Sequence, residues 1–186
     1  MKLFALALFG AAVVLAPSSV VAAELPNKTI AMAAPKPLPD VQFEDGQGHR
    51  GNLSDFRGKI VLLTIWATWC APCRREMPTL DRLQATLGGP DFQVTPLSID
   101  RGGADVVRKF FAQIGIKHLA IRLDSSGEVL QSLAVVGLPT TVLIDPKGRE
   151  IGRLIGPADW DTPQMIADLK SVIARRSGVA PNTKQK

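Results

Sequence analysis

Residues 60–78 read IVLLTIWATWCAPCRREMP, and this stretch determines the kind of fold that the chain can adopt. Its opening part, Ile60–Trp66, is apolar or β-branched throughout, which predicts a strand buried on both faces. Apolar residues then recur at helical spacing from Glu76 to Leu87, so we expect a helix there. The two cysteines, Cys70 and Cys73, therefore lie between a buried strand and a helix.

Strand and helix patterns alternate along the rest of the chain. We expect strands over residues 92–99, 119–123, 140–144 and 150–155, and helices over residues 105–114, 128–134 and 162–176. Asp145-Pro146-Lys147-Gly148 separates the last two strands as a hairpin turn would, and residues 41–58 read as a hairpin-like edge. This order predicts an α/β fold with helices on both faces of a mixed central sheet.

The two ends of the chain depart from this pattern. Residues 1–23 combine Lys2 with a long uncharged apolar stretch and small residues before position 24, which is typical of a secretory signal peptide. An uncleaved membrane anchor formed by residues 3–23 is the alternative, because the stretch is almost long enough to span a bilayer. We read residues 24–36 as a proline-rich leader, residues 37–176 as the folded domain and residues 177–186 as a polar tail. Export would place the domain in the periplasm, either soluble or tethered to the inner membrane.

The charge of the chain does not indicate a nucleic-acid partner. Its 22 basic and 17 acidic residues give a net charge of +5, which falls to +4 if residues 1–23, with Lys2, are removed. The bases occur singly or in pairs, such as Arg74-Arg75, without a dense basic run or interleaved aromatic residues. We therefore expect solvated charged surfaces and no nucleic acid.

The spacing of the cysteines points to chemistry rather than to a structural crosslink. A disulfide restrains the unfolded chain more as its loop grows, so a bridge across two residues stabilises little. At the start of a helix, unpaired N–H groups and the helix dipole favour a thiolate, the attacking species in disulfide exchange. We expect Cys70 to attack and Cys73 to resolve the mixed disulfide. Pro72 fits the first helical turn, and Trp69 offers a flat docking surface beside Cys70.

A zinc half-site or a pair of buried structural thiols is the alternative reading of these cysteines. A tetrahedral zinc site needs four ligands, and only His49 and His118 could complete one. Neither histidine has finger-like spacing to the cysteines, so we expect no metal. The glycine cluster at residues 101–103 lacks a nucleotide- or flavin-binding pattern, so we expect no cofactor either.

Three stretches together resemble the TlpA/ResA-like branch of the thioredoxin superfamily. They are WATWCAPCRREMP (66–78), GLPTTVLID (137–145) and PDVQFEDGQGHRGNLSDFRGKIVLLTIW (39–66), and the likeness covers residues 37–175. The resemblance implies a thioredoxin-like three-layer sandwich and a thiol:disulfide oxidoreductase with a redox disulfide between Cys70 and Cys73. It also implies a cis bond between Leu138 and Pro139, where the backbone would pair with the bound partner chain.

Two positions bear on how the second sulfur would lose its proton. Thioredoxins use a carboxylate on the strand before the cysteines, but the matching residue here is Thr64, which cannot act as a base. Proteins that resemble ResA carry a glutamate three residues after the second cysteine, which matches Glu76. The resemblance therefore nominates Glu76 as a proton acceptor or pKa modulator, the alternative being a surface helical glutamate beside Arg74 and Arg75.

The resemblance also implies a biological role. Such proteins are reductants in an otherwise oxidising compartment and act on particular protein thiols, for haem attachment in cytochrome c maturation or for copper-site assembly. Their electrons come from a membrane-embedded thiol transporter. A dedicated cytochrome c maturation protein would carry an acidic residue soon after its cis-proline, whereas Thr140 and Thr141 follow Pro139 here.

Two other classes share features of this sequence. A peroxiredoxin-type peroxidase has the same fold but uses one peroxidatic cysteine, and the WCAPC motif at residues 69–73 disfavours it. A Sco-like copper metallochaperone would bind Cu(I) through its thiolates and a histidine. Sco-type proteins separate their cysteines by three residues and place that histidine before a late strand, whereas the gap here is two and His118 lies well before Pro139.

Overall fold

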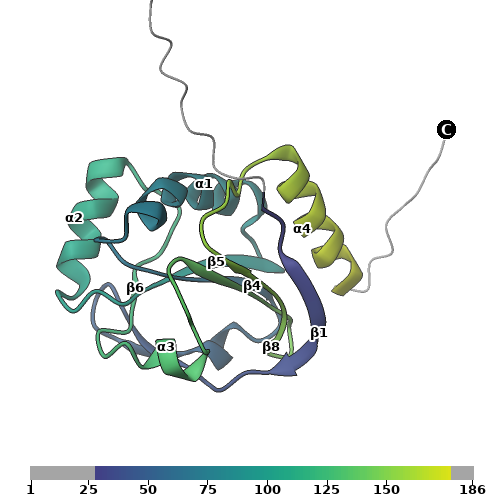
Figure 1. Ribbon diagram of the computed structural model, residues 1–186, viewed down its shortest axis with the longest axis horizontal. Coiled ribbons are helices and arrows are strands. Elements are labelled where there is room, and N and C mark those ends of the chain that lie inside the picture. Colours follow the sequence, from purple (N-terminus) through teal and green to yellow (C-terminus); the bar gives the residue numbers. More distant parts are fainter. Residues whose placement is uncertain (1–27, 177–186) are drawn as a thin grey trace, which may run out of the picture.

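The computed structural model describes residues 28–176, and within that range one eight-stranded sheet forms the centre of the molecule (Figure 1). Its strands are β1 (Ala31–Pro37), β2 (Gln42–Asp45), β3 (Arg50–Asn52), β4 (Ile60–Trp66), β5 (Phe92–Ser98), β6 (Arg122–Leu123), β7 (Thr140–Ile144) and β8 (Arg149–Ile155). The helices are α1 (Ala71–Leu87), α2 (Ala104–Ile114), α3 (Glu128–Ser132) and α4 (Pro163–Arg176), with one 3-10 turn, η1 (Leu53–Phe56). The strand order is β1-β8-β7-β4-β5-β6-β2-β3.

Strand β4 lies inside the sheet and determines where the cysteines sit. It pairs in parallel with β5, from Ile60 opposite Phe92 to Trp66 opposite Ser98, and antiparallel with β7. Every residue of β4 is buried, as the apolar run predicts. Since α1 begins soon after β4 ends, the cysteine pair lies at the carboxyl edge of the parallel strands, where α/β sheets commonly bind ligands.

Two apolar layers cover the two faces of the sheet. Helices α1, α2 and α4 pack on one face, through residues that include Met77, Leu80, Phe110, Phe111, Met165 and Leu169. Helix α3 and turn η1 pack on the other face, through Val129, Leu133, Leu53 and Phe56. Figure 1 shows α3 across the sheet from α1. The expected thioredoxin-like sandwich, a mixed sheet with helices on both faces, is therefore confirmed.

Strand β1 was not expected, because residues 31–36 of it belong to the stretch that we read as a proline-rich leader. It pairs antiparallel with β8, from Ala31 opposite Arg153 to Pro37 opposite Arg149, and all of its side chains are exposed. Backbone pairing rather than apolar burial therefore holds it in the sheet. Gly152 of β8 allows the close approach, since a Cβ atom there would lie 2.7 Å from the side chain of Ile30.

Several of the predicted segments are at the ends of the chain. The signal or anchor segment 1–23, the first residues of the leader and the tail 177–186 lie outside the described residues. Across residues 28–176, no helix combines the length and the apolar character needed to cross a membrane.

A buried carboxylate of α1 organises the connection between α2 and β6. Asp81 accepts hydrogen bonds from the backbone N–H groups of Lys117 (3.1 Å), His118 (2.7 Å) and Leu119 (3.1 Å). These groups would otherwise be available to a sheet ladder, and β6 is correspondingly short at Arg122–Leu123 instead of the expected 119–123. The carboxylate thus ties the loop before β6 to α1.

We expect Asp81→Ala to lower the free energy of unfolding by about 3 kcal/mol, because it leaves three backbone N–H groups without their acceptor in a part-buried loop. Urea unfolding followed by circular dichroism measures the change. Asp168→Ala is the control, because Asp168 is exposed on α4 and a surface change there should stay within roughly 0.5 kcal/mol. Equal losses in the two variants would show that the Asp81 contacts do not stabilise the fold.

Candidate active site

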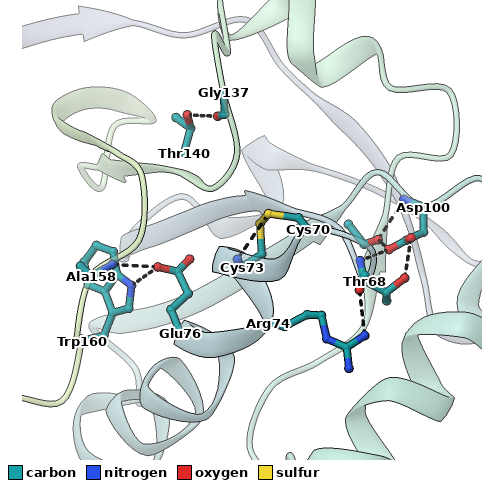
Figure 2. The surroundings of a disulfide bond; sticks show 11 residues. Thr68, Cys70, Cys73, Arg74, Glu76, Asp100, Gly137, Thr140, Ala158 and Trp160 are labelled. Carbon is teal, nitrogen blue, oxygen red and sulfur yellow. Dashed lines mark hydrogen bonds between the residues drawn. A yellow bond between two sulfur atoms is a disulfide. The ribbon is translucent and has the colours of Figure 1, made fainter. Parts of the chain in front are cut away.

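The cysteine pair forms the start of helix α1, directly beyond the end of β4. Cys70 is the N-cap residue, and its sulfur accepts a hydrogen bond from the backbone N–H of Cys73 at 3.3 Å. A disulfide bond joins the two residues (Figure 2). Pro72 lies in the first turn of α1, where a missing N–H removes no helical hydrogen bond. The first sulfur therefore sits at the positive end of a helix of 17 residues.

The two cysteines differ in access to solvent. Cys70 is 7% exposed and Cys73 is fully buried, while Trp69 beside them is 68% exposed. Attack in disulfide exchange requires access as well as thiolate character. An incoming sulfur can therefore reach Cys70 next to the Trp69 ring, whereas Cys73 is shielded.

A carboxylate from the neighbouring strand end holds the loop that precedes Cys70. Asp100 is buried and accepts hydrogen bonds from the Thr68 backbone N–H (2.8 Å) and the Thr68 hydroxyl (2.7 Å). The Ser98 hydroxyl donates to the same carboxylate at 2.7 Å. Figure 2 shows this network beside the disulfide. Sequence reasoning missed Asp100 and Thr68; an aspartate just after a buried strand was the available signal.

The first turn of α1 carries a cation and no acid. The Arg74 side chain donates to the Thr68 carbonyl oxygen at 3.3 Å, and its guanidinium lies 4.9 Å from the centre of the Phe110 ring. No acidic residue occupies that turn. A positive charge one turn from Cys70 and the helix dipole both favour the thiolate form of an N-cap cysteine.

Glu76 is buried, so its reading as a surface helical glutamate is wrong. It is 0% exposed, and its Oε2 atom accepts hydrogen bonds from the Ala158 backbone N–H and the Trp160 indole N–H, both at 3.1 Å. Oε1 is also buried and has no hydrogen-bond partner among the described residues. Burial raises the pKa of Glu76 from 4.5 to about 7, although the two hydrogen bonds act in the opposite direction.

Glu76 and Cys73 lie three positions apart on α1, which places them on the same side of the helix. In the view of Figure 2 the carboxyl group lies between Cys73 and the loop that carries Ala158 and Trp160. A carboxyl group whose pKa lies near neutrality can exchange a proton at neutral pH. The arrangement therefore supplies a titratable group beside the buried sulfur.

The second sequence motif forms a turn at the start of β7. The Leu138–Pro139 peptide bond is cis, as the resemblance implied, and the Thr140 hydroxyl donates to the Gly137 carbonyl oxygen at 2.7 Å across that turn. Leu138 packs against the core cluster that contains both cysteines. The motif and the cysteine pair, far apart in sequence, thus meet in one region of the molecule.

The position where thioredoxins carry a carboxylate holds a satisfied hydroxyl pair here. Thr64 of β4 lies opposite Thr141 of β7, and their hydroxyl oxygens are 3.0 Å apart in the buried sheet. A threonine hydroxyl cannot act as a base in this setting. Glu76 is therefore the titratable group whose burial fits proton exchange near the disulfide.

The histidines are not gathered at the cysteines. His49 lies in the β2–β3 turn, where it contacts Asp45, and the His118 backbone contacts Asp81 on the loop before β6. Within residues 28–176, no cluster of three or more His, Cys, Asp and Glu side chains is arranged to hold a metal ion.

A pocket of about 700 Å³ opens beside Trp69, with Ile99, Arg101 and Leu130 in its wall.

Comparison with known proteins identifies relatives with this architecture. The AhpC/TSA family model matches residues 35–149. Thiol-disulfide oxidoreductase ResA from Geobacillus kaustophilus is 36% identical over 125 residues, which cover 67% of this chain and 70% of that protein. ResA from Bacillus cereus is 33% identical over 131 residues, which cover 70% of this chain and 74% of that protein.

A solved structure agrees with these matches. The crystal structure of a protein assigned as thiol:disulfide interchange protein DsbE from Chlorobium tepidum superposes with a TM-score of 0.64 and 28% identity. The match covers 78% of this chain and 99% of that one. The chain therefore belongs to the AhpC/TSA family and, within it, to the ResA-like thiol:disulfide oxidoreductases of the thioredoxin superfamily.

Proposed function

We propose that this protein is a partner-specific disulfide reductase in which Cys70 attacks and Cys73 resolves. The difference in access between the two cysteines carries the proposal, because Cys70 reaches the surface beside Trp69 while Cys73 is fully buried. An attacking sulfur with slight access to solvent and a fully shielded resolving sulfur direct a partner to Cys70 first. Only a partner bound at Cys70 brings a mixed disulfide within reach of Cys73.

The exchange proceeds in two displacements. The Cys70 thiolate attacks one sulfur of a partner disulfide, forms an S–S bond to it and releases the other partner sulfur as a thiolate. Cys73 then gives up its proton and attacks the Cys70 sulfur, which breaks the mixed disulfide and releases the second partner thiolate. Two electrons pass to the partner, and the Cys70–Cys73 disulfide forms.

Glu76 is the proposed acceptor of the Cys73 proton. Its pKa of about 7 lies near the operating pH, where a general base combines sufficient ionisation with sufficient basicity. The carboxylate oxygen Oε1 makes no other hydrogen bond among the described residues, so it can receive the proton without breaking one. Glu76 then releases the proton to solvent or to the departing partner thiolate.

Trp69, Pro72, Leu138 and Pro139 are the proposed partner-binding residues. The exposed Trp69 ring supplies apolar contact area beside the attacking sulfur. The cis Leu138–Pro139 turn lies in the same region, and we expect the backbone beside Pro139 to pair with an extended partner segment. These contacts would present the partner's disulfide to Cys70.

The proposed location is the periplasm or cell envelope. The signal-like or anchor-like composition of residues 1–23 supports export, and the match to a protein assigned as DsbE is consistent with it. In that compartment the partners would be the disulfides of proteins in cytochrome c maturation or copper-site assembly. A membrane-embedded thiol transporter would re-reduce Cys70 and Cys73.

We expect the domain to show a reversible two-electron couple that is lost in both Cys70→Ser and Cys73→Ser. For a reductase, its potential should lie nearer to about −270 mV than to about −120 mV, the values of reducing thioredoxin and oxidising DsbA. Equilibrium titration in glutathione and dithiothreitol buffers, read by the tryptophan fluorescence, measures it. Cys73→Ser should accumulate a mixed disulfide with a partner, whereas Cys70→Ser should not.

The competing functions give other results in the same preparation. A potential near that of DsbA would identify an oxidant. Rapid consumption of hydrogen peroxide by the Cys73→Ser variant would identify a peroxidase. Stoichiometric Cu(I) binding by the reduced protein without a reversible couple would identify a Sco-like metallochaperone.

We expect Glu76→Gln to slow release of the second partner thiolate by roughly 100-fold at pH 8, because a positioned general base contributes at about that level. Single-turnover mixing of the reduced protein with a chromogenic disulfide separates this step from the attack by Cys70, which should keep its rate. Glu44→Gln, a change at an exposed position of β2, is the control. If both steps keep their rates in Glu76→Gln, Glu76 is not the proton acceptor.

The raised pKa of Glu76 also predicts how the free energy of unfolding of the oxidised protein depends on pH. Its pKa is raised by folding from 4.5 to about 7, so its favourable contribution is complete below pH 4.5 and is lost as the pH rises through 7. Relative to Glu76→Gln, the wild-type protein should therefore lose about 3 kcal/mol of unfolding free energy between pH 4.5 and pH 8. Urea unfolding at several pH values tests this. A difference that does not change with pH would show that Glu76 titrates normally.

A further inference from the structure

The loop between β8 and α4 contacts one side of α1 at three successive positions. These are Glu76, Thr79 and Arg82, spaced three residues apart. The Thr79 hydroxyl accepts a hydrogen bond from the Trp160 backbone N–H at 3.1 Å, and Arg82 forms an ion pair with Asp161. We call residues 158–161 the α1-facing loop. It joins the C-terminal part of the chain to the helix that carries the cysteines.

Trp160 makes two contacts that converge on Glu76. It is fully buried and belongs to the core cluster that contains both cysteines. Its indole N–H, which can only donate, points at Glu76 Oε2 at 3.1 Å. Its backbone N–H is held by Thr79, whose hydroxyl in turn donates to the Glu76 carbonyl oxygen at 2.8 Å. The ring is therefore fixed against the same helical turn whose carboxyl group it contacts.

The two oxygen atoms of Glu76 are treated differently by their surroundings. Both donors, the Trp160 indole and the Ala158 N–H, bind Oε2, while buried Oε1 has no partner among the described residues. A proton can therefore reside on Oε1 while both hydrogen bonds to Oε2 remain. The carboxyl group can change its charge without turning, so proton transfer needs no rearrangement of the α1-facing loop.

The charged groups on the elements packed against Glu76 do not account for the shift of its pKa. Asp159 and Asp161 lie on the α1-facing loop, Arg82 and Asp81 lie on α1, and the cysteine thiols titrate on α1 when reduced. Asp161 is paired with Arg82. The pKa of Glu76 is shifted by burial and by its two hydrogen bonds rather than by these charges. The donors to Oε2 are thus the specific polar influence on Glu76.

We propose that Trp160 is a positioning residue for the exchange reaction: its indole N–H fixes the Glu76 carboxyl group and sets the pH at which Glu76 takes up a proton. This inference rests on the proposed function of Glu76, and it names Trp160 as the group that controls the protonation of Glu76. Removal of a donor to a carboxylate disfavours the charged form, so loss of the indole N–H shifts proton uptake to higher pH.

The chain offers a closely matched control in Trp66. Trp66 is also fully buried in the same core cluster, where it stacks on Phe111 and packs against Phe110. Its indole N–H has no hydrogen-bond partner among the described residues. Trp160→Phe and Trp66→Phe therefore remove the same atoms from the same layer, but only the first removes a donor to Glu76.

The experiment titrates Glu76 directly in the oxidised full-length chain. The carboxyl ¹³C signal of Glu76, assigned by its absence in Glu76→Gln, is followed from pH 4 to pH 9 in the wild type and both variants. We expect Trp160→Phe to raise the midpoint by about one pH unit and Trp66→Phe to leave it within about 0.3 unit. An unchanged midpoint in Trp160→Phe, or equal shifts in the two variants, would overturn the proposal.

Two further measurements separate this proposal from the role of Glu76 and from misfolding. If the pH profile of second-thiolate release is the same in Glu76→Gln and wild type, the proton-acceptor function fails, even where the Trp160→Phe midpoint has moved. If Trp160→Phe does not fold, the benzothienyl analogue of tryptophan at position 160 keeps the ring shape and replaces the N–H by sulfur. The same upward shift is expected with the analogue, and its absence would overturn the proposal.

Discussion

The pairing of β4 on both of its edges is the constraint on which the site depends. Hydrogen bonds to β5 on one side and β7 on the other fix the end of β4, and hence the start of α1. The same two neighbours then supply parts of the site. Asp100 follows β5 and holds the loop before Cys70, and the cis-proline turn leads into β7. Three adjacent strands in the middle of the sheet thus deliver the disulfide, its support and the second motif to one edge.

The two sulfurs acquire different properties from their different surroundings at the start of α1. Around Cys70, the helix end and Arg74 favour negative charge, and the surface is near. Around Cys73, burial disfavours charge. The same apolar surroundings raise the pKa of the nearby Glu76 to about 7. A single gradient of burial along the first turns of α1 therefore separates the proposed attacking sulfur from the proposed proton acceptor.

Local sequence patterns predicted those helices and strands that form because of the pattern of their own residues. The run in β4 and the helical spacing in α1 are of this kind, and both elements formed as expected. Strand β1 was not predicted, because its residues are exposed and pair through the backbone, which leaves no apolar periodicity in the sequence. Gly152 in the opposite strand was the available signal. The burial of Glu76 and the contacts of Asp100 could not be read locally, because their partners lie on other elements of the fold. Trp160 was missed for the same reason.

The sequence separation within the site has a consequence for how the protein is made. The donors to Glu76 lie 82 and 84 residues beyond it, on the loop after the last strand. A chain that has not yet placed its C-terminal segment therefore lacks the groups that surround the acid. The glutamate is buried, and its pKa raised, only where the α1-facing loop packs against α1. The full difference between the two sulfurs is in this sense a property of the finished molecule.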